Sequence, residues 1–174
     1  MQDIPTFLPG RLFIGRGTWK DYRELAPFHY LPGRPATSAL VGTVRYVSAG
    51  SQFCNARLTA VGVLSYPVPS CLPRRTAIGI TGTRDDELRF ANRHIRTISR
   101  VIVHPQFRSL GLSSVLVRWL CAHSPTRYVE ALAVMGRAHP FFERAGMTRI
   151  DPQSDNAPVY FLFDRKSQRR GHLR

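Results

Sequence analysis

Residues 101–114 read VIVHPQFRSLGLSS, and this stretch is the most informative in the 174-residue chain. The β-branched run that begins at Ile95 predicts a buried strand, which Pro105 ends. After a polar turn, a helix is predicted to end at Pro125. Its apolar face consists of Leu112, Val115, Leu116, Trp119 and Leu120. The chain therefore passes from a strand through a short turn directly into an amphipathic helix.

The start of this helix has the residues of an anion-binding site. The first backbone N–H groups of a helix lack intrahelical partners, and the positive end of the helix dipole lies there. Gly111 lets an anion approach the backbone closely, Ser113 and Ser114 can donate hydrogen bonds, and Arg108 adds a charged donor. Together these residues predict a pyrophosphate site, although many ordinary helices also begin with Gly and Ser.

The rest of the chain alternates between predicted strands and helices. Strands are expected at residues 39–47, 58–66, 127–135 and 157–163, and short helices at residues 18–25 and 137–145. Residues 1–17 are expected to be an extended lead-in, 67–73 a loop, and 81–93 a loop or a short helix. This order predicts an α/β fold with a mixed central sheet flanked by helices, as one domain over residues 1–164. Residues 165–174 are expected to form a basic, flexible tail.

The composition is that of an ordinary globular protein, with 43% hydrophobic and 21% charged residues. Cys54, Cys71 and Cys121 are far apart in the sequence, which excludes a disulfide framework or a zinc finger, and we expect no metal site. No apolar run is long enough to span a membrane, and the first residues lack the layout of a signal peptide. We therefore expect a cytoplasmic protein with no membrane partner.

The net charge of the chain is unusual, because 25 Lys and Arg face 11 Asp and Glu, which gives +14 at pH 7. Such a charge attracts polyanions and predicts a DNA or RNA partner or a phosphate-rich cofactor. Among the basic residues only Lys20 and Lys166 are lysines, a bias that a GC-rich genome would explain. Codon bias does not explain the shortage of acidic residues, so the charge favours a functional polyanion partner.

Two motifs, in this order, resemble the GNAT N-acetyltransferase superfamily. Residues 108–113, RSLGLS, are similar to its R/Q-x-x-G-x-G/A motif, and residues 138–147, AHPFFERAGM, are similar to its A-x-x-F-Y-x-x-x-G-F helix and turn. The resemblance implies a V-shaped opening between two neighbouring strands and acetyl-CoA, or another acyl-CoA, as cofactor. It implies that the pantetheine arm pairs with the backbone near Ile102 and Val103. The cofactor-binding turn that it implies consists of Arg108, Ser109, Leu110, Gly111, Leu112, Ser113 and Ser114.

The chain departs from the family pattern at three positions. Ser113 replaces a small Gly or Ala, Met135 stands where Asn is common, and Phe142 stands where the family often has a Tyr. In the family, that Tyr protonates the departing CoA thiolate. Without it, the proton must come from another residue, or the thiolate leaves unassisted, which a thiol pKa of about 8.5 allows near neutral pH.

The candidate catalytic residues are Glu130, His139, Ser99 and Tyr30. Glu130 lies in an otherwise apolar strand, where desolvation raises the pKa of a carboxylate and suits it to act as a general base. The structural alternative is an ion pair between Glu130 and an arginine such as Arg100. His139 is a second candidate base, and its alternative role is to cap a helix or to lie at the surface. Ser99 is a candidate hydrogen-bond donor to the acyl carbonyl or to the acceptor.

The acceptor side is predicted to include His29 and Tyr30, for which packing is the alternative role. The wider sequence pattern resembles a GNAT subgroup of phages and mobile elements that is similar to the Mom-like DNA-modification proteins. This resemblance implies acyl transfer to a base of a nucleic acid, and the net charge of +14 agrees with it. A base in a duplex must be flipped out for such chemistry, and Tyr30, Tyr66, Phe141 or Phe142 could stack on it.

Two other functions stay open from the sequence. An N-acetyltransferase of a small amine or a protein amine would need acidic residues around the acceptor cleft, and the chain has few of them. A non-catalytic nucleic-acid-binding protein on a degenerate GNAT fold would explain the missing Tyr and the basic tail. The complete set of diphosphate-binding residues counts against this second alternative, and a measurement of acetyl-CoA binding separates it from the enzymes.

Overall fold

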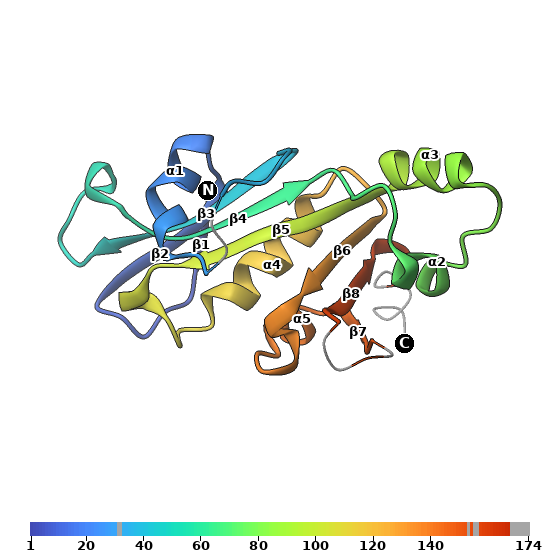
Figure 1. Cartoon of the computed structure of the whole chain (residues 1–174). Coiled ribbons are helices and arrows are strands. Elements are labelled where there is room, and N and C mark those ends of the chain that lie inside the picture. Colours follow the sequence, from blue (N-terminus) through green and yellow to red (C-terminus); the bar gives the residue numbers. More distant parts are fainter. Residues whose placement is uncertain (31–32, 153, 155–156, 168–174) are drawn as a thin grey trace.

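The computed structural model of the chain describes residues 1–30, 33–152, 154 and 157–167. An eight-stranded sheet with the strand order β1-β2-β3-β4-β5-β6-β8-β7 runs through the whole fold (Figure 1). Its strands are β1 (Gln2–Ile4), β2 (Gly10–Arg16), β3 (Leu40–Ser48), β4 (Arg57–Ser65), β5 (Ile95–Val103), β6 (Tyr128–Ala133), β7 (Thr148–Ile150) and β8 (Val159–Asp164). All neighbouring strands are antiparallel except β5 and β6, which are parallel. The sheet is therefore mixed, as the sequence predicts.

Helices lie against both faces of the sheet (Figure 1). They are α1 (Trp19–Leu25), α2 (Leu72–Ile78), α3 (Arg84–His94), α4 (Leu112–His123) and α5 (Phe141–Arg144). Short 3₁₀ helices are η1 (Ala26–Phe28), η2 (Phe53–Asn55), η3 (Pro105–Phe107) and η4 (Val134–Arg137). In Figure 1, α3 lies at one end of β5 and η3 at the other. No helix among the described residues is long and apolar enough to cross a bilayer.

The helix α4 packs closely on one face because Gly62 of β4 has no side chain. A Cβ atom at Gly62 would lie 2.7 Å from Leu120 Cδ1 and 3.2 Å from Leu116 Cγ. Leu112, Leu116 and Leu120 belong to the largest hydrophobic cluster of the protein. The apolar face predicted for this helix is thus its buried face, and its burial fixes where the N-terminus of α4 points.

The helix α1 covers the opposite face of the sheet. Thr18 and Asp21 form a capping box at its start, which confirms the helix expected over residues 18–25. Tyr22 and Leu25 are buried in a second hydrophobic cluster, together with Ile102 of β5. The two faces of the sheet therefore carry separate cores, and β5 contributes to both of them.

A β-bulge in β5 explains how that strand serves both cores. In the register of β4 and β5, Val63 pairs with Arg100 and Leu64 pairs with Ile98, which leaves Ser99 as the extra residue. Ile98 packs in the α4-side cluster and Ile102 in the α1-side cluster. Residues four apart in a regular strand share a face, so the bulge reverses the alternation of the strand at this point.

The strands β5 and β6 separate after a short paired segment. Their pairing runs only from Ile95 opposite Tyr128 to Thr97 opposite Glu130, whereas β5 continues to Val103. Beyond Thr97, the backbone groups on this edge of β5 have no partner in β6. The V-shaped opening that the resemblance implies is confirmed.

Two expectations for irregular segments were wrong. Residues 1–17 contain β1 and β2, and β2 pairs with β3 along its whole length. The loop expected over residues 67–73 ends early, because Leu72 begins α2 with a Pro in its first turn. These segments carry weak local patterns, and pairing or packing with distant residues decides their conformation.

The other differences concern helix lengths and the end of the chain. The ambiguous residues 81–93 contain α3, whose start is a capping box of Thr83 and Asp86. The helix expected over residues 137–145 is confined to α5, and the short edge strand β7 was not expected. Arg165, expected to begin a flexible tail, donates hydrogen bonds to the Cys121, Ala122 and Ser124 carbonyls at the end of α4. Residues 168–174 of the expected tail lie outside the described residues.

Candidate active site

The turn before α4 presents backbone donors to a ligand. Gly111 is the N-cap residue, with φ of +74°, and no side chain makes a capping hydrogen bond there. The first N–H groups of α4 are therefore not capped by the protein. Ser109 also has a positive φ, +67°, a conformation that costs an L-residue about 1–2 kcal/mol. Successive backbone N–H groups in such turns form anion-binding concavities, and strain of this kind is concentrated at functional sites.

This turn lines a cavity of about 480 Å³. Residues from both faces of the sheet line it, because Gly111 belongs to the α4 side whereas Phe28 ends η1 on the α1 side. Between them, Val101, Ile102 and Val103 supply the part of β5 that has no partner in β6. The cavity thus follows the opening between β5 and β6 from one face of the sheet to the other.

Most of the predicted cofactor residues meet in this cavity. Among the residues predicted from the sequence, its lining includes His29, Tyr30, Ile102, Val103, Arg108, Ser109, Gly111, Leu112, Ser113, Ser114 and His139. Leu110 does not line the cavity, and its side chain is exposed. The sequence motif and the tertiary structure therefore agree on the position of the turn.

The electrostatics of the cavity favour an anion. Arg108 and Arg144 line it together with His29 and His139, and no Asp or Glu is among its described lining residues. Arg144 is held in place through its backbone, because its carbonyl accepts a 2.8 Å hydrogen bond from Arg118 Nη2. Two guanidinium groups near the uncapped end of α4 add to the positive end of the helix dipole.

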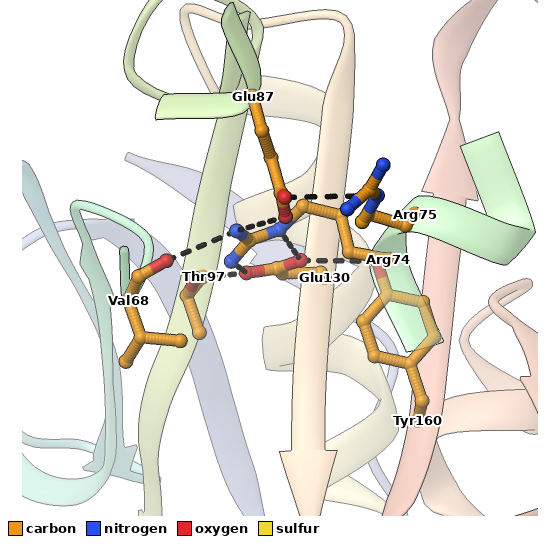
Figure 2. A network of polar contacts seen from close by, with 7 residues as sticks. All are labelled: Val68, Arg74, Arg75, Glu87, Thr97, Glu130 and Tyr160. Carbon is orange, nitrogen blue, oxygen red and sulfur yellow. Dashed lines mark hydrogen bonds and ion pairs between the residues drawn. The ribbon is translucent and has the colours of Figure 1, made fainter. Parts of the chain in front are cut away.

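Glu130 lies outside this cavity, in the buried network that Figure 2 shows. Its side chain has no exposed surface. Arg74 Nε donates to Glu130 Oε2 at 2.9 Å, and Arg74 Nη2 donates to Oε1 at 2.8 Å. The hydroxyls of Thr97 and Tyr160 donate to the same carboxylate at 2.7 and 3.0 Å. Glu130 therefore forms the ion pair considered as its alternative role, but with Arg74 rather than with Arg100.

The charges of this network perturb its neighbours. Burial alone would lower the pKa of Arg74, but the hydrogen bonds and the charge of Glu130 raise it overall. Burial, reinforced by the adjacent Glu130 carboxylate, raises the pKa of Tyr160. A second carboxylate, Glu87 of α3, has an oxygen 3.9 Å from Arg74 Nη1 and another 3.8 Å from Arg75 Nε (Figure 2). The network ties α2 and α3 to the paired ends of β5 and β6.

Three other predicted site residues also lie away from the cavity. Phe142 is buried and stacks on Phe161, with ring centroids 4.7 Å apart. Tyr66 is half exposed, and the Arg96 guanidinium lies over its ring at 4.1 Å. Ser99 Oγ lies 2.7 Å from Ser65 Oγ within the bulge. Neither Phe142 nor Tyr66 lines this cavity, and substrate contact by either residue stays a prediction.

Sequence reasoning missed several lining residues, namely Phe28, Val101, Phe107, Pro140 and Arg144. Phe107 is buried, and Phe28 reaches the site from η1 by packing its ring edge-on to His104 at 5.0 Å. No local pattern marks Phe28, because the fold of the first loop brings it there. Arg144 lies inside the second motif and could have been found as the basic residue of that helix.

The comparisons with known proteins bear on the fold. No protein-family profile matches the sequence, and no curated protein sequence is similar to it. The structure is similar to NAA60 of Arabidopsis thaliana in complex with acetyl-CoA, with a TM-score of 0.57 and 11% identity, over 88% of this chain and 99% of that chain. It is also similar to an apo form of agmatine N-acetyltransferase, with a TM-score of 0.53 and 14% identity, over 88% and 99% of the two chains.

A third similar structure is the aminoglycoside acetyltransferase AAC(6')-Ib in complex with coenzyme A and kanamycin. Its TM-score is 0.52 at 16% identity, over 92% of this chain and 99% of that chain. At such identities the likeness defines the fold. The chain has the α/β fold of the GNAT N-acetyltransferases, over nearly its whole length.

Proposed function

We propose that the chain is an acyl-CoA-dependent N-acyltransferase whose acceptor amine belongs to a nucleic acid. The observation that carries the proposal is a single cavity that joins the uncapped N-terminus of α4 to the opening between β5 and β6. A diphosphate followed by an extended thioester arm needs these two features in succession. The fold shared with N-acetyltransferases supports the same class of cofactor.

The residues of the cavity fit an acyl-CoA. The first N–H groups of α4, with the side chains of Arg108 and Ser113, would hold the diphosphate. A Cβ atom built at Gly111 meets no atom within 4 Å, so the space in front of the turn is open. The unpaired edge of β5 near Ile102 and Val103 offers backbone hydrogen bonds to the amide groups of the arm.

Acyl-CoA supplies a thioester: an amine nitrogen forms a bond to its carbonyl carbon, the carbon–sulfur bond breaks, and the proton lost by nitrogen ends on the CoA sulfur. His29 and His139 line the cavity, and their imidazole nitrogens can accept or pass on this proton. Phe142 has no hydroxyl group and is buried, so it serves packing and supplies no proton. Tyr30, which lines the cavity and is largely exposed, offers a phenol on the acceptor side.

The electrostatics distinguish between classes of acceptor. The cavity repels a small polycationic amine, because Arg and His line it and no carboxylate is among its described lining residues. A nucleic acid instead brings phosphates that match the net charge of +14. The exposed ring of Tyr30, whose centroid is 4.7 Å from that of His29, offers a surface on which a base can stack.

Nucleoside mass spectrometry tests this proposal. The purified full chain is incubated with acetyl-CoA and with separate pools of DNA, RNA and small amines. The nucleic acids are then digested to nucleosides, and the masses of the nucleosides and of the amines are measured. We expect one acetyl group to be added to a nucleoside of one pool, and calorimetry to record acetyl-CoA binding. Arg108→Glu is expected to weaken acetyl-CoA binding and to reduce the amount of acetylated nucleoside.

The two parts of the proposal can fail separately. If acetyl-CoA binds and only the small amines are acetylated, the nucleic-acid acceptor is wrong. If the folded chain does not bind acetyl-CoA or another acyl-CoA, the enzyme assignment is wrong, and a polyanion-binding protein with this fold is left.

A further inference from the structure

A partly buried arginine, Arg100, lies at the opening between β5 and β6 and has no counter-ion among the described residues. Arg100 pairs with Val63 in the register of β4 and β5, and cross-strand partners point to the same face. Val63 is buried in the α1-side cluster, so the Arg100 side chain leaves the sheet on the α1 side. It follows the bulge at Ser99 and directly precedes Val101, which lines the cavity.

The guanidinium of Arg100 has few partners. Its Nη1 donates a 2.7 Å hydrogen bond to the carbonyl of the preceding Ser99, and its Nε is buried without a hydrogen-bond partner. No carboxylate among the described residues forms an ion pair with it. Arg74, the buried arginine over the paired end of the same strand, has instead a carboxylate, Glu130, and a second acid nearby. A partly buried guanidinium whose Nε has no hydrogen-bond partner is stabilised when a ligand supplies an anion.

The positive charge continues beside this position on the same face of the sheet. A second cavity of about 480 Å³ shares His29 and Tyr30 with the first, and Arg23 and Arg34 line it. Its described lining residues include no Asp or Glu. Tyr30 thus has arginines on both sides, Arg108 and Arg144 in the first cavity and Arg23 and Arg34 in the second.

We propose that Arg100 binds a phosphate group of the acceptor, an inference that rests on the proposed function. A guanidinium holds a phosphate through two parallel N–H donors, and here Nε and Nη2 form the edge that no protein acceptor occupies. Because Nε is screened from solvent, binding requires the guanidinium to turn from the Ser99 carbonyl toward the ligand. One bond to a neutral carbonyl is then exchanged for charge-assisted bonds to an anion.

This contact also excludes some acceptors. The positive charge of Arg100 rejects polycations, which would otherwise compete for the same site. Arg100 therefore selects an acceptor that carries a phosphate near its nucleophilic nitrogen, as a nucleotide does.

Binding measurements on the full chain saturated with CoA test the proposal. Two probes share the phosphate chemistry, a short single-stranded oligonucleotide and a nucleoside monophosphate, and both are titrated at several salt concentrations. The variants are Arg100→Gln and Arg100→Lys. The matched control is Arg96→Gln, because Arg96 lies on the same strand with a buried, unpartnered Nε but is stacked on Tyr66.

We expect Arg100→Gln to weaken probe binding by at least about tenfold and to reduce the salt dependence of oligonucleotide binding by about one unit of log–log slope. Arg100→Lys keeps the charge and should retain that slope, which separates charge from folding. Arg96→Gln should stay within about twofold of the wild type. A loss with the oligonucleotide alone identifies a backbone phosphodiester, and an equal loss with both probes identifies a nucleotide phosphate.

The proposal is overturned if Arg100→Gln and Arg96→Gln bind the probes equally well, or if the CoA-saturated wild type binds neither probe. Acetyl-CoA affinity is measured on the same samples and is expected to be unchanged in all variants. If the wild type fails to bind acetyl-CoA, it is the proposed enzyme function that fails.

Discussion

Thr97 and Glu130 form the last pair between β5 and β6, and the Thr97 hydroxyl donates a 2.7 Å hydrogen bond to the Glu130 carboxylate. Beyond this pair the strands separate to form the opening that the cavity follows. Arg74 of α2 and Tyr160 of β8 donate further hydrogen bonds to the same carboxylate. The buried network thus fixes the point where the strands part, and with it the inner end of the opening.

The Arg74–Glu130 pair is expected to be strongly coupled in folding. Arg74→Met or Glu130→Leu leaves an unpaired buried charge and should cost about 3–5 kcal/mol of unfolding free energy. The double variant should lose much less than the sum of the two costs, as urea denaturation can measure. Arg127→Met breaks a partly exposed pair with Asp164 and should cost less than about 1 kcal/mol. If the losses of unfolding free energy in the two single variants simply add in the double variant, Arg74 and Glu130 are not coupled.

Gly111→Leu should abolish acetyl-CoA binding while the fold survives. The side chain would fill the open space before α4, and the left-handed conformation would strain the turn. Gly79→Leu is the matched control, because Gly79 is also left-handed at a helix end, with φ of +72°, and faces open space. Calorimetry should record a loss of acetyl-CoA binding for Gly111→Leu alone. The circular dichroism spectra of both variants should match that of the wild type. An equal loss in the two variants would mean that strain, not the site, is responsible.

Arg108→Glu should weaken acetyl-CoA binding by about ten- to a hundredfold, because it replaces a charge-assisted donor with a repulsive carboxylate. Arg57→Glu changes the net charge equally, but Arg57 contacts Gln106 at 2.9 Å and does not line the cavity. Its effect on affinity should stay within a few-fold. If both variants lose affinity equally, the cofactor senses only the overall charge.

The three cysteines should differ sharply in reactivity. Cys54 is exposed, whereas burial raises the pKa of Cys71, and raises the pKa of Cys121 to about 12. At pH 8, a thiol reagent should modify Cys54 rapidly, and the other two only after unfolding. Fast modification should disappear in Cys54→Ser. Labelling of Cys121 in the native protein would show that the core around α4 opens.

The same burial predicts how stability varies at alkaline pH. In the unfolded chain a thiol ionises near pH 8.5, whereas Cys121 stays protonated in the fold until about pH 12. The unfolded state therefore loses its proton first, and the unfolding free energy should fall as the pH rises from about 9 toward 12. Urea denaturation of Cys121→Ala, whose curve should be flatter over this range, measures the contribution.

The turn before α4 could be predicted from the sequence because its signal is local. One short stretch of sequence contains the strand that ends before Pro105, then Gly111, and then the apolar face of the next helix. Each of these features depends on residues that are neighbours along the chain. The helix at Trp19 was predicted for the same reason, since Thr18 caps it. The strands β1 and β2 could not be predicted, because their hydrogen bonds come only from sheet pairing, of β1 with β2 and of β2 with β3.

Glu130 marks the limit of reasoning from sequence. A carboxylate within an apolar strand can act as a general base or form an ion pair. No residue near Glu130 in the sequence indicates its partner Arg74, which lies 56 residues away. The positions of Phe142 and Tyr66 could not be predicted for a similar reason, because the sequence does not distinguish an aromatic side chain that stacks on neighbouring residues from one that lines a cavity.

The amino-acid sequence by itself determined the charge, the strand–turn–helix unit and the donors at the start of α4, since these depend on composition and on neighbours along the chain. Only the tertiary structure decided which residues share the cavity and where β5 and β6 separate. It also decided that Arg100 has no acidic partner among the described residues, whereas Glu130 is bound by Arg74, Thr97 and Tyr160. Burial and ion pairing arise between residues that are distant in the chain, so they depend on packing and have no local signature.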